Sequence, residues 1–90
     1  MSTIRLYQAL DKWDDIKKGD TDNAFSIEFV QNDGTIRYFK RAVKCGTRFS
    51  LKDNEMRACI PIDEDGNRIG HPTPFSIWRI VNFNGQKIVL

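Results

Sequence analysis

The chain has 90 residues, of which 40% are hydrophobic and 29% charged, and its formal net charge is +2. This length and composition fit one globular domain, residues 1–90, with a single modest core. The sequence contains no run of about 18 apolar residues, which excludes a membrane-spanning helix.

The cysteines and the N-terminus bear on the cellular compartment. Cys45 and Cys59 are too few for a disulfide framework, and the first residues lack the apolar segment of a secretory signal. We therefore expect a reducing, cytoplasmic environment. In a secreted chain the same two thiols would be free to pair.

Residues 4–18 predict an amphipathic helix, because apolar side chains recur at spacings of three and four. These side chains are Leu6, Ala9, Leu10, Trp13 and Ile16. Ser2 or Thr3 would cap the start of the helix, and Gly19 would follow its end. We expect the apolar stripe to cover one face of a sheet or to plug one end of a barrel.

Residues 24–43 predict a β-hairpin, since apolar and polar residues alternate on the approach to Gly34. A two-residue turn would pair Phe29 with Tyr38, and a three-residue turn with a bulge would pair Ile27 with Phe39. The sequence leaves both registers open. We favour the bulged one, because it places Phe39 on the apolar face.

The middle of the chain gives weaker signals. Residues 48–51 predict a short strand or bridge, and residues 56–62 predict a further strand. Pro61 has no backbone N–H to donate, so this strand should lie at an edge of the sheet or end near Pro61.

Residues 75–90 predict a second hairpin, with one long strand to Phe83, a type I′ turn at Asn84-Gly85 and a returning strand. This register places Val81 opposite Ile88, so that both faces of the long strand are apolar. Such a strand is usually central, but one apolar face exposed to a partner is the alternative.

Together these elements predict an α+β, mainly β fold, with the N-terminal helix packed on a four- to six-stranded antiparallel sheet. An open sheet and a small SH3-like or OB-like barrel are both compatible with the pattern. Much of the core should come from Phe25, Ile27, Phe29, Ile60, Ile77, Ile80, Val81, Ile88 and Val89.

The sequence offers no catalytic or metal-binding motif. His71 lies alone between Gly70 and Pro72, and the cysteines are not spaced as zinc ligands. Counted from Asp63, the sixth and twelfth positions of a calcium loop would be Arg68 and Pro74, so that motif fails and the segment predicts an acidic turn. We expect no enzyme activity, no metal and no cofactor.

The basic middle of the chain suggests one binding mechanism. Residues 35–57 hold seven Lys or Arg against two acidic residues. Cations beside Tyr38 and Phe39 are typical of surfaces that bind single-stranded nucleic acid, although an ordinary solvated face explains them as well. The candidate residues for this function are Arg37, Lys40, Arg41, Lys44 and Arg48.

Trp13 and Trp78 are expected to meet in the core. An exposed Trp78, with its neighbour Arg79, would instead be the leading candidate for a protein interface.

The layout Phe-Ser-Ile-x-Phe-Val-x-x-Asp-Gly-Thr at residues 25–35, with Ile-Val-x-Phe-Asn-Gly-x-x-Ile-x-Leu at residues 80–90, resembles short uncharacterised bacterial proteins found around phages and mobile elements. The resemblance implies no function and no active residues. From the residues themselves we expect a small non-enzymatic protein-interaction module, which binds an unidentified protein or itself. Nucleic-acid binding is the alternative.

Overall fold

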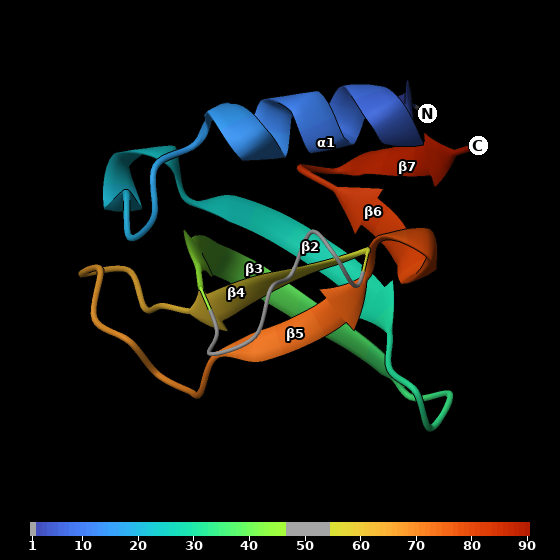
Figure 1. Cartoon of the computed structure of the whole chain (residues 1–90). Coiled ribbons are helices and arrows are strands. Elements are labelled where there is room, and N and C mark those ends of the chain that lie inside the picture. Colours follow the sequence, from blue (N-terminus) through green and yellow to red (C-terminus); the bar gives the residue numbers. More distant parts are fainter. Residues whose placement is uncertain (1, 47–54) are drawn as a thin grey trace.

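The computed structural model describes residues 2–46 and 55–90, and these form one helix packed on a mostly antiparallel sheet (Figure 1). The predicted α+β, mainly β fold is confirmed. The helix is α1 (Leu6–Asp15), and two short 3-10 helices are η1 (Thr21–Asn23) and η3 (Ile77–Arg79). The strands are β1 (Thr3–Arg5), β2 (Phe25–Val30), β3 (Ile36–Cys45), β4 (Met56–Pro61), β5 (Thr73–Ser76), β6 (Ile80–Phe83) and β7 (Gln86–Val89).

In the described residues the sheet has seven strands, in the order β1-β7-β6-β2-β3-β4-β5. This exceeds the predicted four to six for two reasons. Residues 3–5 join the sheet as β1, which pairs in parallel with β7, and the long strand expected at 75–83 is split into β5 and β6. The expected short strand at 48–51 lies outside the described residues.

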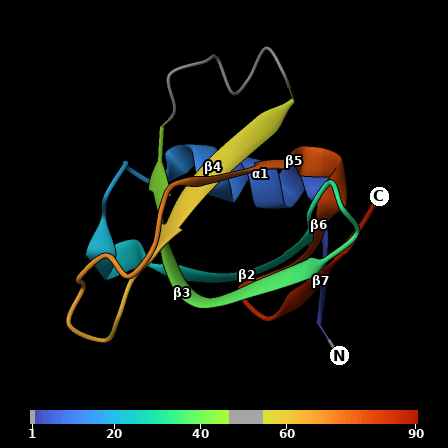
Figure 2. The same cartoon turned by 90° about the horizontal axis from the view of Figure 1, so that it is seen from below.

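The sheet bends strongly without closing into a barrel (Figure 2). Phe75 on β5 stacks on Phe29 of β2, with ring centroids 4.7 Å apart, although β3 and β4 separate these strands in the sheet. Among the described residues, β5 at one edge of the sheet pairs only with β4, and β1 at the other edge pairs only with β7. We call the concave face that carries these rings the inner face, and the opposite one the outer face.

The main core lies between the inner face and α1. Trp13 is 3% exposed, and its ring centroid lies 4.5 Å from that of Phe25, 5.7 Å from that of Phe75 and 6.1 Å from that of Phe83. Of the predicted helix stripe, Leu6 and Ala9 are also buried. Aromatic rings meeting at these angles and distances contribute packing energy beyond the area that they bury.

The helix is shorter than predicted at both ends. Thr3–Arg5 extend along β7, so neither Ser2 nor Thr3 caps the helix, and the Gln8 side-chain oxygen instead accepts the Arg5 backbone N–H at 3.2 Å. After Asp15 the chain becomes extended. Gly19, with φ of 73°, lies beyond the helix, and its N–H donates to the Lys44 carbonyl on β3 at 2.9 Å.

The bulged register of the first hairpin is confirmed, because Ile27 pairs with Phe39. The Gln31 N–H donates to the Thr35 carbonyl at 2.8 Å, and Gly34 adopts φ of 89°, which closes a three-residue turn.

The second hairpin keeps the predicted turn, in which Asn84 and Gly85 have φ of 52° and 76° as a type I′ turn requires. Its core assignments hold only in part. Ile80 is buried, but Val81, Ile88 and Val89 are only half-buried, and Ile77 is half-buried in the turn η3.

β4 is not an edge strand, because it pairs with both β3 and β5. The alternative, that it ends near Pro61, is correct: its pairing with β5 stops at Cys59 and the strand ends at Pro61. Ile60, predicted for the main core, belongs to a separate outer cluster with Val43 and Ile62 on the outer face.

Candidate functional site

An exposed tryptophan marks the junction between β5 and β6. The Ser76 hydroxyl accepts the backbone N–H of Trp78 at 3.3 Å, which turns the chain out of the extended conformation. The strand expected at 75–83 therefore breaks here. Trp78 is 59% exposed, so the prediction that it lies in the core with Trp13 is wrong.

The Trp78 side chain is held in place by Glu55. Its indole N–H donates to a Glu55 carboxylate oxygen at 2.6 Å, and the Ile77 backbone N–H donates to the Glu55 carbonyl at 3.0 Å. Glu55 has φ of 53°, a left-handed conformation that is rare in non-glycine residues and persists where the surroundings fix it. The two hydrogen bonds to Glu55 restrict Trp78 in the free chain and so reduce the conformational freedom that it would lose when another molecule binds.

Arg79 is also exposed, and its guanidinium donates to the Gln31 carbonyl of the first hairpin at 3.1 Å. Between Gln31 and Ser76 lies a groove of about 300 Å³. Its walls combine apolar and polar side chains, namely Val30, Gln31, Asn32, Asp33, Met56, Pro74, Phe75 and Ser76. We call this groove, with Glu55, Trp78 and Arg79 beside it, the Trp78 corner.

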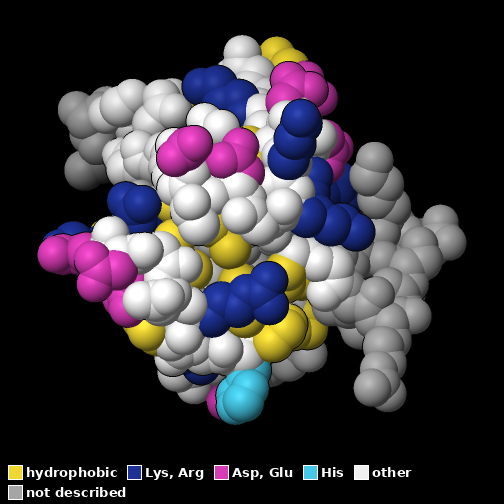
Figure 3. All heavy atoms as spheres, turned by 90° about the vertical axis from the view of Figure 1, so that its left-hand side faces the viewer, with side chains coloured by type: hydrophobic (Ala, Val, Ile, Leu, Met, Phe, Trp, Pro, Cys, Tyr) yellow, Lys and Arg dark blue, Asp and Glu magenta, His cyan; other side chains and the backbone are white. Residues whose placement is uncertain are grey.

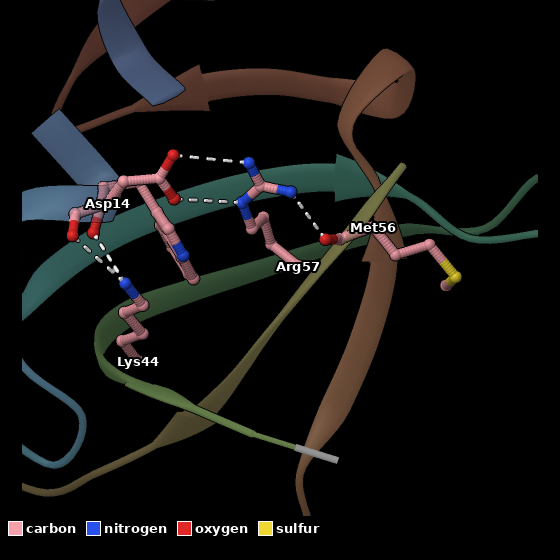
Figure 4. Close-up of polar contacts among 5 residues, drawn as sticks. Asp14, Lys44, Met56 and Arg57 are labelled. Atoms are coloured by element: carbon pink, nitrogen blue, oxygen red, sulfur yellow. Dashed lines mark hydrogen bonds and ion pairs between the residues drawn. The ribbon is translucent and has the colours of Figure 1, made fainter. Parts of the chain in front are cut away.

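The basic residues of the middle segment do not form one surface. Lys44 is half-buried and turns toward the end of α1, where its ammonium group donates to the carbonyls of Trp13 at 3.2 Å and Asp14 at 3.5 Å (Figure 4). Arg37 lies on the inner face, 5.2 Å from the centroid of the Phe39 ring. Arg48 lies outside the described residues.

Lys40 and Arg41 remain together. Both are exposed, and they line a groove of about 590 Å³ that also contains Asp63 and Glu64. The Arg41 guanidinium donates to the Thr21 carbonyl at 3.3 Å. Carboxylates therefore share this groove with the two cations, which weakens its attraction for phosphates.

One polar contact was not predicted from the sequence. The Arg57 guanidinium forms a two-pronged ion pair with Asp14, with nitrogen–oxygen distances of 3.3 and 3.4 Å, and also donates to the Met56 carbonyl at 2.8 Å (Figure 4). It ties α1 to β4, which are 43 residues apart in sequence at these positions. No local pattern signals such a pair.

The face that carries η1 and the loop between β4 and β5 mixes both charges with apolar atoms (Figure 3). The acidic segment forms the predicted turn, in which the Asp63 carboxylate accepts the backbone N–H groups of Asp65 and Asn67 at 2.9 and 2.8 Å. His71 is exposed in the same loop. Across residues 2–46 and 55–90, no three His, Cys, Asp or Glu side chains gather as metal ligands would.

The two cysteines lie on opposite faces of the sheet and are not bonded to each other. Cys59 belongs to the main core, and burial raises the pKa of its thiol to about 12. Cys45 packs against the outer cluster. Burial raises the pKa of Cys45 too, while the charges of Arg68 and Lys18 oppose the shift.

No family model, curated protein or solved structure matches the chain. The resemblance to short bacterial proteins around phages and mobile elements therefore stays a prediction. The described helix is too short and too polar to span a membrane.

Proposed function

We propose that this chain is a non-enzymatic protein-interaction module that binds its partner at the Trp78 corner. The observation that carries the proposal is a tryptophan that is 59% exposed and yet fixed by a 2.6 Å hydrogen bond to Glu55. Tryptophan and arginine are enriched among the residues that dominate binding energy at protein interfaces, and here they are neighbours.

The partner in this proposal is a protein segment with an apolar side chain. Val30, Met56 and Pro74 give the groove its apolar walls, and Trp78, whose backbone N–H donates to the Ser76 hydroxyl of the groove wall, adds an exposed indole ring near it. Arg79 fixes the Gln31 side of the groove through its hydrogen bond to the Gln31 carbonyl. A cytoplasmic location is part of the proposal, and the unpaired thiols of Cys45 and Cys59 suit it.

The test is selection from a displayed random-peptide library, followed by fluorescence anisotropy with the enriched peptides. Trp78→Ala should weaken binding by about 30-fold, the usual effect of removing a central interface residue. Arg79→Glu should also weaken it. The matched control is Tyr7→Ala on α1, which removes an aromatic side chain that is 61% exposed and should leave binding unchanged.

Thermal unfolding of each variant checks that the fold is intact. If Trp78→Ala does not fold, Trp78→Phe replaces it, because it removes the indole N–H and part of the ring while keeping an aromatic side chain. Peptides that bind the wild type and Trp78→Ala equally well would overturn the proposal. An equal loss in Tyr7→Ala would do the same.

Nucleic-acid binding through Lys40 and Arg41 is the alternative function. It is favoured by the exposure of Tyr38, which lies on the same face of β3 as Lys40. Binding of short DNA and RNA strands that weakens steeply with salt, and is lost in the Lys40→Glu, Arg41→Glu double variant, would support it.

A further inference from the structure

The two halves of β3 differ in how they are paired. Ala42–Cys45 pair with β4, but Ile36–Lys40 pair only with β2, since β4 ends at Pro61. The bond from the Ile62 N–H to the Arg41 carbonyl, at 3.0 Å, lies at the boundary between the two halves. Among the described residues, no strand lies along the other edge of Ile36–Lys40.

The register of the hairpin shows which backbone groups this edge presents. The Gln31 N–H donates to the Thr35 carbonyl, which places these residues at a hydrogen-bonded position of the ladder, and in an antiparallel ladder such positions alternate. Arg37 and Phe39 therefore direct their N–H and C=O groups toward β2. The groups of Ile36, Tyr38 and Lys40 point to the open edge, spaced as an added strand requires.

The side chains of this edge combine exposed apolar groups with three cations, Arg37, Lys40 and Arg41. Ile36 is 62% exposed and Tyr38 is 59% exposed, both on the outer face, and of the first six residues of β3 only Phe39 is buried. The other edge strands differ: β5 contains Pro74, and β1 has three residues. Long, proline-free edges with exposed apolar side chains are able to pair with another chain.

We propose that this edge binds a second copy of the same chain, through antiparallel pairing of β3 with β3 about a two-fold axis at Tyr38. In this register Tyr38 faces Tyr38 of the second copy, and Ile36 faces Lys40. All three residues with outward backbone groups then form hydrogen bonds.

Charge selects this register over its neighbours. With the axis at Tyr38, Arg37 faces Phe39 of the other copy, and its guanidinium already lies 5.2 Å from its own Phe39 ring. With the axis at Arg37, two arginines would face each other. With the axis at Phe39, Arg37 would face Arg41. Like charges placed directly opposite destabilise a strand pair, so of these three registers the one with the axis at Tyr38 is favoured.

The edge is formed by β3 alone and includes no residue of the Trp78 corner, so the pairing does not depend on the proposed function. Sedimentation-equilibrium measurements on the full chain, under reducing conditions, give the dimer dissociation constant. The decisive variants are Ile36→Glu and Ile36→Lys, because residue 36 faces Lys40 twice in each dimer.

Ile36→Glu should tighten the dimer and Ile36→Lys should weaken it, each by about tenfold. Lys40→Glu added to Ile36→Lys should restore it. Loss of an apolar contact alone would weaken the dimer in both single variants, and that result would overturn the register. A wild-type protein that stays monomeric at its highest soluble concentration would overturn the proposal.

Amide hydrogen exchange provides a second readout that needs no substitution. As protein concentration rises, the N–H groups of Ile36, Tyr38 and Lys40 should become protected. Those of Arg37 and Phe39, which already bond to β2, should not change. Equal exchange at all concentrations where a dimer is present would place the contact elsewhere.

Discussion

The two faces of the sheet are built very differently. Between the inner face and α1, Trp13 of the helix packs with Phe25, Phe29 and Phe75 of the sheet in one continuous aromatic core. The outer face buries the outer cluster of three aliphatic residues, and elsewhere leaves large side chains such as Tyr38 in solvent. The difference suggests that the inner face supplies most of the stability, which leaves the outer face and its edges available for contacts.

The largest effect should come from the centre of the main core, between α1 and the inner face. Trp13→Ala should lower the free energy of unfolding by about 3–5 kcal/mol, because it empties a site bounded by three aromatic rings. Tyr38→Ala on the outer face should change it by less than about 0.5 kcal/mol. Urea denaturation followed by circular dichroism gives both values, and similar costs would remove the distinction between the faces.

The pH dependence of stability provides a second comparison of the two faces, because Cys59 lies on the inner face and Cys45 on the outer face. The pKa of Cys59 is about 12 in the folded chain, against an ordinary value of 9.0, so at high pH the unfolded chain releases this proton first. Stability should be unaffected by Cys59 below pH 9 and should fall as pH rises from 9 toward 12, by at most about 1.4 kcal/mol per pH unit.

The pH effect of Cys59 is isolated by comparing the wild type with Cys59→Ala, which should lose that part of the slope. Cys45→Ala, on the outer face, is the control and should keep the Cys59 part. Urea denaturation at several pH values between 8 and 10.5 measures both. If Cys45→Ala removes the larger part of the slope, the buried thiol of the inner face is not the cause.

The smallest of these effects concerns the rim of the inner face, where Asp14 holds Arg57. Asp14→Asn should cost about 1 kcal/mol, since the Arg57 side chain is only 11% exposed and would keep its charge with one acceptor fewer. Asp11→Asn, at an exposed position of the same helix, is the control and should cost almost nothing. Equal costs would mean that the ion pair does not fasten α1 to the sheet.

What the sequence predicted well was local. The hairpin turns at Gly34 and Asn84-Gly85 follow from residues that tolerate positive φ, and the register of the first hairpin followed from the need to bury Phe39. The predicted helix stripe is confirmed for Leu6, Ala9 and Trp13, which are buried, whereas Ile16 lies just beyond the end of the helix. Each of these features is decided within about 20 residues of chain.

The errors concern contacts between distant segments. The sequence pattern assigned Lys44 to a basic surface. In the structure its ammonium group instead donates to the carbonyls of Trp13 and Asp14 at the end of α1, about 30 residues earlier in the chain. Trp78 looked like a core residue within an apolar strand. A local signal for its exposure was present, since Ser76 two residues earlier favours a turn, but its partner Glu55 is 23 residues away.

The parallel pair of β1 and β7 brings residues near the two ends of the described chain side by side, with Ile4 against Ile88 (Figure 1). During synthesis on the ribosome, β1 is made before β7 and cannot pair with it until residues 87–89 have been added. Contacts between residues so far apart slow folding, because a long loop must close before they form. Ile4, 6% exposed in the finished fold, thus lacks its neighbour Ile88 until β7 has been made, and its apolar side chain is less well covered during that time.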